Sequence, residues 1–256
     1  MRAYLAAMID ELIDVMLNSR RFAVLTGAGI SAESGVPTFR GQDGLWGKFR
    51  AEELATMDAF MANPKLVWEW YNWRRELMAD VKPNPGHHAL AELEALADDF
   101  TLITQNVDGL HRQAGSKAIL EVHGNIHRNK CADCNRVLAE DIEIDPDSIP
   151  TCERCGGRIR PDVVWFGEML DSDILSNAFR ASEAADLFFS VGTSAIVHPA
   201  ASLPMMAKRC GAALVEINPE RTPLTDLADF YVSAKSGEYL PDLVEQFRRR
   251  RSAPEV

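Results

Sequence analysis

The sequence predicts an α/β protein in which a parallel sheet carries helices on both faces and a small inserted domain lies beside it. Three observations support this fold class. Short apolar runs alternate with helical patterns, a glycine-rich turn follows the first of these runs, and four cysteines fall in two closely spaced pairs. A chain of 256 residues has room for one large core and one smaller module.

The elements follow one another in a regular order. Apolar residues three and four positions apart predict an amphipathic helix over residues 5–17. Buried strands are predicted at residues 22–26, 100–104, 119–122, 187–191, 213–217 and 230–233. Helical patterns lie between them, at residues 64–79, 87–97, 173–185, 199–209 and 239–250. Such alternation is typical of a Rossmann-like parallel sheet with helices on both faces.

Two stretches interrupt the alternation. Residues about 42–84 are helical and rich in aromatic side chains, and residues about 125–162 carry the cysteine pairs with little periodicity. We expect the two stretches to form one small domain, built from a helical module and a zinc module. The large Rossmann-like domain would then comprise residues about 1–41, 85–124 and 163–256.

The composition excludes several classes of function. A net charge of −11 argues against specific nucleic-acid binding, which needs basic patches, but suits protein partners that present lysine. No apolar run reaches the roughly 18 residues that a membrane-spanning helix requires. The first 16 residues hold three acids and no signal-peptide cleavage site, so we expect a cytoplasmic protein.

The cysteine spacing predicts a metal site. Cys131 and Cys134 form one C-x-x-C pair, and Cys152 and Cys155 form a second pair after 17 intervening residues. This spacing matches a four-thiolate zinc site, whereas disulfides fit poorly with a reducing compartment. Four protein ligands leave no open coordination position, so the expected zinc ion is structural.

Candidate ligand-binding residues follow the predicted strands. Gly27-Ala28-Gly29 ends the first strand and allows close backbone approach to a ligand, with a tight strand–helix turn that binds no ligand as the alternative. Gln105, Asn106 and Asp108 follow the second strand, where an Asn or Asp could instead cap a helix. His123 ends the third and is a candidate base, although a histidine at a strand end is often structural. The carboxyl ends of parallel strands meet at one edge of the sheet, where ligands bind.

Taken together, these motifs resemble the sirtuin family. The similarity covers residues about 20–240 and includes GAGISAESGVPTFRG followed by DGLW, then TQNVDG, EVHGN and RPDVVWFGE. It implies a single sirtuin-type catalytic region over residues 1–256, with NAD as co-substrate and one structural zinc ion. It also implies His123 as catalytic base, assisted by Asn106 and Asp108.

The resemblance assigns the remaining site residues. It implies cofactor contacts from the glycine loop and the strand ends, with Ser236 as a looser assignment: Gly27, Ala28, Gly29, Glu33, Thr38, Phe39, Arg40, Trp46, Gln105, Asn106, Asp108, Gly192, Thr193, Ser194, Asn218, Pro219, Glu220 and Ser236. Val163, Val164, Trp165 and Phe166 resemble the segment that pairs with substrate backbone, and the residues VVWF alone predict a strand.

A helical segment suggests which acyl group is removed. Tyr71 and Arg74 are three positions apart and share a helix face, where a hydroxyl and a guanidinium together suit a carboxylate, unless Arg74 is simply solvated. The pair resembles the Tyr-x-x-Arg of sirtuins that remove succinyl and malonyl groups, and Ala55 matches a small residue that widens their acyl pocket.

The resemblance therefore implies an enzyme that transfers acyl groups from protein lysine to ADP-ribose, releasing nicotinamide. Its partners would be acylated-lysine proteins, and acetyl and succinyl or malonyl groups its substrates. Two alternatives stay open at this point: a protein mono-ADP-ribosyltransferase, and a non-enzymatic NAD-sensing module with a zinc ribbon.

Overall fold

The sheet at the centre of the fold has six parallel strands. A computed structural model describes residues 2–38, 50–138 and 144–252 of the chain. The sheet order is β3-β2-β1-β6-β7-β8, and every neighbouring pair runs parallel, which confirms the predicted fold class. The strands are β1 (Arg21–Thr26), β2 (Asp99–Thr104), β3 (Ile119–Glu121), β6 (Leu187–Val191), β7 (Ala213–Ile217) and β8 (Phe230–Val232).

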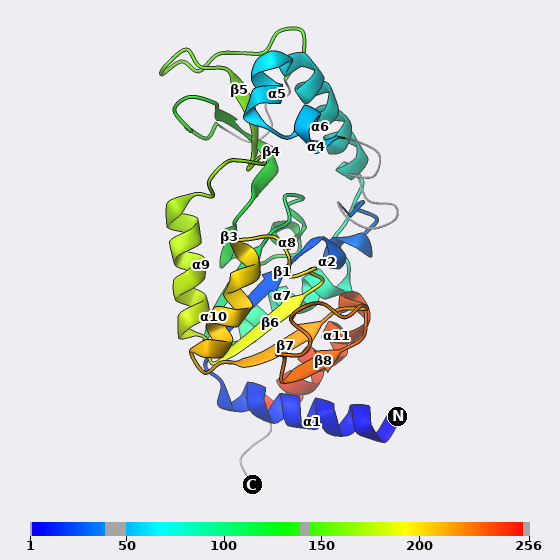
Figure 1. Cartoon of the computed structure of the whole chain (residues 1–256). Coiled ribbons are helices and arrows are strands. Elements are labelled where there is room, and N and C mark those ends of the chain that lie inside the picture. Colours follow the sequence, from blue (N-terminus) through cyan, green and yellow to red (C-terminus); the bar gives the residue numbers. More distant parts are fainter. Residues whose placement is uncertain (1, 39–49, 139–143, 253–256) are drawn as a thin grey trace.

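Helices cover both faces of this sheet (Figure 1). On one face lie α1 (Arg2–Asn18), α7 (Pro85–Leu96) and α11 (Ser236–Arg251), and on the other α9 (Ser172–Ala184), the 3₁₀ turn η1 (Ala200–Ser202) and α10 (Leu203–Arg209). Side chains alternate between the two faces along each strand. Val24 therefore packs in the core beneath α1, α7 and α11, while Ala23 and Leu25 pack in the core beneath α9 and α10. Two short helices, α2 (Ala28–Ala32) and α8 (Leu110–Gln113), follow the carboxyl ends of β1 and β2.

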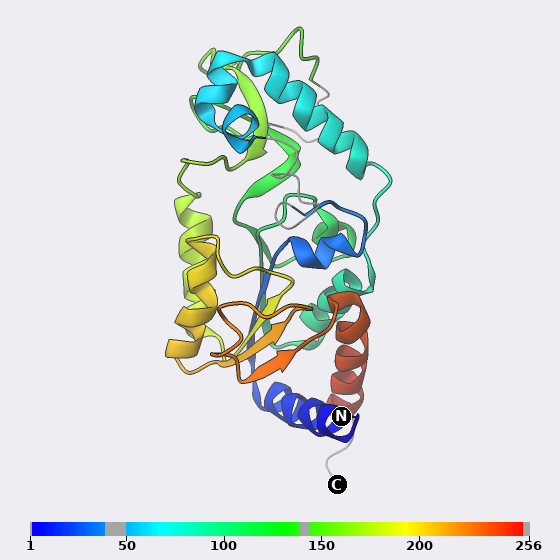
Figure 2. The same ribbon diagram turned by 45° about the vertical axis from the view of Figure 1, so that its right-hand side comes forward.

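A smaller unit lies beyond the carboxyl edge of the sheet (Figures 1 and 2). It contains α4 (Ala51–Leu54), α5 (Met57–Ala62), α6 (Pro64–Met78) and the antiparallel strands β4 (Gly124–Cys131) and β5 (Ile159–Val163). The Asn63 side chain caps α6, accepting from Leu66 N–H at 3.1 Å, and Pro64 occupies the first turn. Trp68 is fully buried against β5, where its indole N–H donates to Ile159 O at 3.1 Å.

The strands of this unit differ from expectation. Residues 125–162 show little periodicity in sequence, yet β4 and β5 pair there. The periodicity is missing because charged side chains on the two strands contact one another rather than alternating with apolar ones. The predicted strand over residues Val163–Phe166 is wrong beyond Val163, because β5 ends at that residue. Glu168 explains the ending, because its carboxylate accepts from Trp165 N–H at 2.8 Å in place of a ladder carbonyl.

No helix within the described ranges is both long enough and apolar enough to cross a membrane.

Candidate functional site

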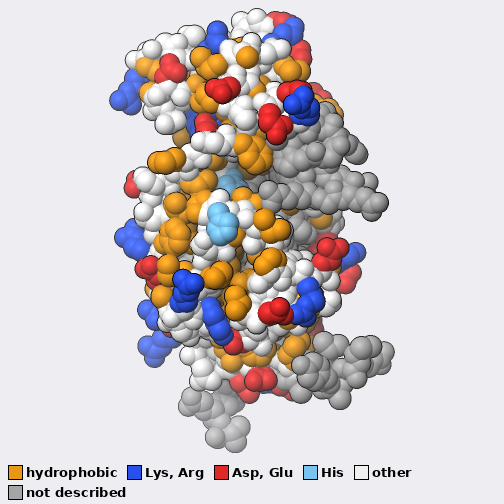
Figure 3. Space-filling model, in the orientation of Figure 1, with side chains coloured by type: hydrophobic (Ala, Val, Ile, Leu, Met, Phe, Trp, Pro, Cys, Tyr) orange, Lys and Arg blue, Asp and Glu red, His pale blue; other side chains and the backbone are white. Residues whose placement is uncertain are grey.

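A cleft of about 710 Å³ separates the carboxyl edge of the sheet from the smaller unit. Both units line it, and Figure 3 shows hydrophobic and histidine side chains gathered on this face of the molecule. Most of the residues predicted to form the site line this cleft: Gly27, Ala28, Gly29, Thr38, Ala55, Tyr71, Arg74, Gln105, His123, Val163, Val164, Trp165, Phe166, Gly192, Thr193 and Ser194.

The glycine turn after β1 packs against the turn after β6. A Cβ atom at Gly29 would lie 2.7 Å from Gly192 O, and one at Gly192 would lie 2.5 Å from Ile30 N. Gly192 also adopts a φ of +58°, which favours glycine. Two backbones therefore approach without side chains between them, and both turns line the cleft.

The segment after β2 places three polar side chains behind this turn. Gln105 Nε2 donates to Thr193 Oγ1 at 2.9 Å, and Asn106 Nδ2 donates to Gly27 O at 3.0 Å. Asp108 is buried, and its carboxylate accepts from Leu110 N–H at 2.9 Å. Burial raises the pKa of Asp108, although the hydrogen bond from Leu110 opposes the rise. The motif thus links the ends of β1, β2 and β6.

His123 follows β3 and faces the cleft. Its Nδ1 lies 3.0 Å from Gln105 O, and since a carbonyl only accepts, Nδ1 carries a proton. The neutral imidazole then has its lone pair on Nε2. Burial lowers the pKa of His123 from 6.5, while the hydrogen bond to Gln105 partly opposes the change. A neutral ring with an accepting Nε2 is the form that a general base requires.

Two buried histidines, which the sequence analysis did not assign to the site, lie next to these residues. The His87 and His111 rings are 4.8 Å apart, His111 Nε2 is 3.0 Å from Thr26 Oγ1, and His87 Nε2 is 3.4 Å from Ser31 Oγ. Burial lowers the pKa of His87 to about 4 and of His111 to about 3. Their proximity depends on the packing of α7 against α8, which no local sequence pattern reveals.

Other predicted cofactor residues lie around the cleft rather than on its wall. Glu33 Oε1 accepts from Ser236 Oγ and from Gly237 N–H, both at 2.9 Å, and so holds the start of α11. Asn218 Nδ2 donates to Thr193 O at 2.9 Å, next to the exposed residues Pro219 and Glu220. Three more predicted residues lie outside the described ones: Phe39, Arg40 and Trp46.

Tyr71 and Arg74 lie at the end of the cleft formed by α6. Both are buried, and the Arg74 guanidinium lies 4.8 Å from the centre of the Trp70 ring. Trp165 Nε1 donates to Tyr71 Oη at 2.8 Å, so one lone pair of the hydroxyl is occupied. Burial lowers the pKa of Arg74 and raises that of Tyr71. The tyrosine is therefore a neutral hydroxyl, placed beside a cation.

The four paired cysteines converge at the end of β4, which Cys131 terminates. Their sulfur atoms all lie within 4.8 Å of one another, with Cys131 and Cys155 Sγ 3.4 Å apart and Cys134 and Cys152 Sγ 3.8 Å apart. Four thiolates at about 2.3 Å from a zinc ion would lie about 3.8 Å from one another. Backbone N–H groups of Arg154 and Cys155 lower the pKa of Cys152 to about 7. The cluster fits a tetrahedral zinc ion.

Comparison with known proteins finds close relatives over nearly the whole chain. The pattern that defines the Sir2 family matches residues 27–199. An NAD-dependent protein deacylase of Aquifex aeolicus is 51% identical over 91% of this chain and 98% of its own length. One of Pyrococcus furiosus is 51% identical over 94% of this chain and 99% of its own.

Solved structures agree with these relatives. A Sir2 homologue mutant in complex with ADP-ribose superposes with a TM-score of 0.91 at 46% identity, over 96% of this chain and 99% of that one. A Sir2 structure with a p53 peptide and NAD⁺ gives 0.80 at 34% identity, over 93% of this chain and 98% of the other.

Proposed function

The chain belongs to the Sir2 family, and on that premise we propose that it removes acyl groups from protein lysine side chains, using NAD as co-substrate. One observation carries the chemistry: His123 has its lone pair on Nε2 and lines a cleft together with the glycine turn. The products are free lysine, nicotinamide and O-acyl-ADP-ribose. Two similar solved structures, one of Sir2 with a p53 peptide and NAD⁺ and one of a Sir2 mutant with a deacetylated p53 peptide and acetyl ADP-ribose, support acylated proteins as substrates.

In the proposed mechanism the sheet side of the cleft performs the chemistry. NAD would supply the ribose carbon to which nicotinamide is bonded. Nicotinamide leaves this carbon when the oxygen of the acyl group attacks it. His123 Nε2 then accepts a proton from a ribose hydroxyl, which attacks the acyl carbon. Addition of a water molecule to that carbon breaks its bond to the lysine nitrogen, so that free lysine and the O-acyl-ADP-ribose separate. Asn106 and Asp108 orient the ribose, with Asn106 itself held by Gly27 O and Ser31 Oγ. Gln105 and Thr193, joined by a hydrogen bond, border the same space.

We assign the remaining cofactor contacts to the glycine loop and the adjoining strand ends, as expected from the sequence. The zinc ion, held by four cysteines, contributes folding free energy to the smaller unit rather than chemistry.

We also propose a division into a large domain (residues about 1–41, 85–124 and 163–256) and a small one (42–84 and 125–162). The cysteines are free thiols, and the four paired ones are arranged to bind a metal rather than to form disulfides. This arrangement supports a location in the reducing cytoplasm.

The acyl end of the cleft supports a finer proposal, that succinyl and malonyl groups are removed as well as acetyl. Arg74 is buried beside Tyr71, to which it is hydrogen bonded, and both side chains line this end of the cleft, so an anionic group that enters here meets a guanidinium and a hydroxyl together. Trp165 donates to Tyr71 Oη, which favours an outward orientation of the Tyr71 proton. A carboxylate accepts from both Tyr71 and Arg74, and an acetyl group ends too early to reach them.

Val163, Val164, Trp165 and Phe166 form the opposite wall, and Ala55 leaves space beside them. Phe166 N–H donates to Ala55 O at 2.9 Å, so the wall is attached to the residue that follows α4. We propose that this wall lies against the acyl-lysine and its neighbouring backbone.

The deciding experiment incubates purified protein with NAD and matched acetyl- and succinyl-lysine peptides. We expect deacylation of both, with one nicotinamide and one O-acyl-ADP-ribose formed per lysine released. ADP-ribosylated protein without deacylation would indicate a transferase instead, and NAD binding without turnover would indicate a sensor. Either result would overturn the proposed function.

A further inference from the structure

The strand that leaves His123 for the zinc cluster is irregular. β4 pairs with β5 at Gly124, opposite Val163, and again from Asn129 onward, but the register shifts between them. Residues 125–128 are therefore not fixed by a regular ladder. Arg75 of α6 contacts this segment instead, and its Nε donates to Ile126 O at 2.7 Å.

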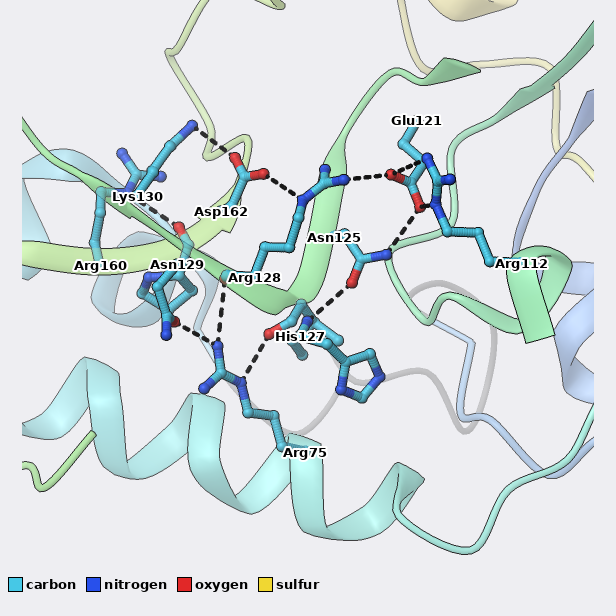
Figure 4. A network of polar contacts seen from close by, with 12 residues as sticks. Arg75, Arg112, Glu121, Asn125, His127, Arg128, Asn129, Lys130, Arg160 and Asp162 are labelled. Carbon is cyan, nitrogen blue, oxygen red and sulfur yellow. Dashed lines mark hydrogen bonds and ion pairs between the residues drawn. The ribbon is translucent and has the colours of Figure 1, made fainter. Parts of the chain in front are cut away.

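Ion pairs replace the missing ladder contacts, as Figure 4 shows. Arg128 lies between two carboxylates: Nη1 donates to Glu121 Oε2 at 2.8 Å, and Nε donates to Asp162 Oδ2 at 3.0 Å. The Glu121 side chain is only 5% exposed and that of Asp162 11%, so these pairs are screened little by solvent. Arg112 also contacts Glu121, and Lys130 also contacts Asp162.

The first carboxylate of this bridge belongs to the loop that carries the base. Glu121 precedes His123 by two residues and Asn125 follows it by two, and Asn125 Nδ2 donates to Glu121 Oε1 at 2.8 Å. This bond closes a five-residue loop around His123. Gly124 turns the chain there with a φ of +82°, and a Cβ atom at Gly124 would lie 2.1 Å from Asp162 O.

The second carboxylate, that of Asp162, belongs to the segment that leads into the substrate wall at residues 163–166. Asp162 immediately precedes Val163, and Val164 N–H donates to His123 O at 3.0 Å. Arg128 thus joins the residue before the substrate wall to the loop of the base. Its removal leaves each carboxylate with another cation, so the bridge is lost without leaving an unpaired buried charge.

We propose that Arg128 is a positioning residue, which holds His123 in register with the substrate wall at residues 163–166. The inference rests on the proposed role of His123 in deacylation. Departure of nicotinamide needs no proton transfer to His123, whereas the later attack of the ribose hydroxyl does. A displaced base therefore slows the later step more than the first.

The test compares two rates in one Arg128→Met variant. Exchange of labelled nicotinamide into NAD, with an acetyl-lysine peptide present, reports the first step, and single-turnover release of free lysine reports the whole reaction. We expect lysine release to fall about tenfold and exchange to change less than about twofold, since small misplacements of a base are costly. Arg209→Met is the matched control, because Arg209 is exposed on α10, away from the cleft.

Folding and charge are controlled separately. Zinc content and the midpoint of thermal unfolding establish that each variant is folded. Arg128→Lys keeps the charge but lacks the fork that spans two carboxylates, so we expect a loss of about threefold, again confined to lysine release. If the methionine variant does not fold, the lysine variant carries the test.

Two results would overturn the inference. Equal losses in exchange and lysine release would mean that Arg128 supports the fold or NAD binding, and wild-type lysine release in a folded Arg128→Met variant would mean that the bridge positions nothing. A His123→Ala variant measured in parallel separates these failures from failure of the premise. If His123→Ala still releases lysine, the proposed role of His123 is wrong, and the inference falls with it.

Discussion

The two walls of the cleft are built by different means. On the sheet side, parallel ladders and close glycine contacts fix the backbone, and the polar residues of the site follow strand ends. On the other side, ion pairs, an aromatic core and a cysteine cluster hold irregular segments in place. We infer that the sheet side carries the reaction common to all acyl substrates, whereas the residues of α6 at the acyl end of the other side select the acyl group.

The largest expected effect lies on the sheet side. His123→Ala should lose deacylation of every acyl-lysine peptide by about 10²–10⁴-fold, the usual range for removal of a general base. NAD binding and thermal stability should stay near wild type. His88→Ala is the control, because His88 is exposed on α7. Near-normal turnover in a folded His123→Ala protein would refute the assignment.

Loss of the metal should affect mainly the opposite side. Cys152→Ser, or a chelator, should remove the expected single zinc ion and increase hydrogen exchange in β4 and β5 more than in β1 and β6. The reason is that binding energy of a four-cysteine site is folding energy for the strands that carry it. Metal analysis and local hydrogen exchange measure the two effects. Full metal content and unchanged exchange in Cys152→Ser would contradict a zinc site.

A smaller and more selective effect is expected at Trp165. Trp165→Phe keeps the aromatic contact with Phe60 but removes the hydrogen bond to Tyr71. A neutral hydrogen bond contributes about 0.5–1.5 kcal/mol, so kcat/KM for succinyl-lysine should fall about two- to tenfold relative to acetyl-lysine. Trp68→Phe also removes an indole hydrogen bond but lies off the cleft, so it should lower stability and leave this ratio unchanged.

If Trp165 acts through Tyr71, then adding Trp165→Phe to a Tyr71→Phe variant should cost no further selectivity. Additive losses in the double variant would show that the two residues act independently.

The smallest effect is a displacement of the pH profile. Burial lowers the pKa of His123, so the neutral imidazole persists at pH values below 6.5, the ordinary pKa of histidine. As pH falls through the lowered pKa, the base becomes protonated and kcat/KM declines. The acid limb of kcat/KM on acetyl-lysine should therefore have its midpoint below pH 6.5. A midpoint above 6.5 would contradict the burial of a neutral ring.

The same contrast decides how much the sequence could predict. The strands of the sheet follow from apolar runs such as LFFSV, and the positions of the glycine turn, Gln105 and His123 follow from strand ends, because a local pattern places them. β4 and the Arg128 bridge could not be predicted, because Glu121, Arg128 and Asp162 come together only through a register shift. Likewise, VVWF has the composition of a strand, but Glu168 binds the backbone of Trp165 and ends it.

Arg74 is the residue at which the two walls can best be told apart, since one wall performs the reaction while the other selects the acyl group. We would measure kcat/KM of wild type and Arg74→Met on matched succinyl- and acetyl-lysine peptides. A hydrogen bond to a charged group contributes about 1.5–3 kcal/mol, which corresponds to roughly 10- to 150-fold. We therefore expect at least about a tenfold loss of kcat/KM on succinyl-lysine and a far smaller loss on acetyl-lysine. Equal losses on both substrates, or a wild type inactive on succinyl-lysine, would contradict this expectation.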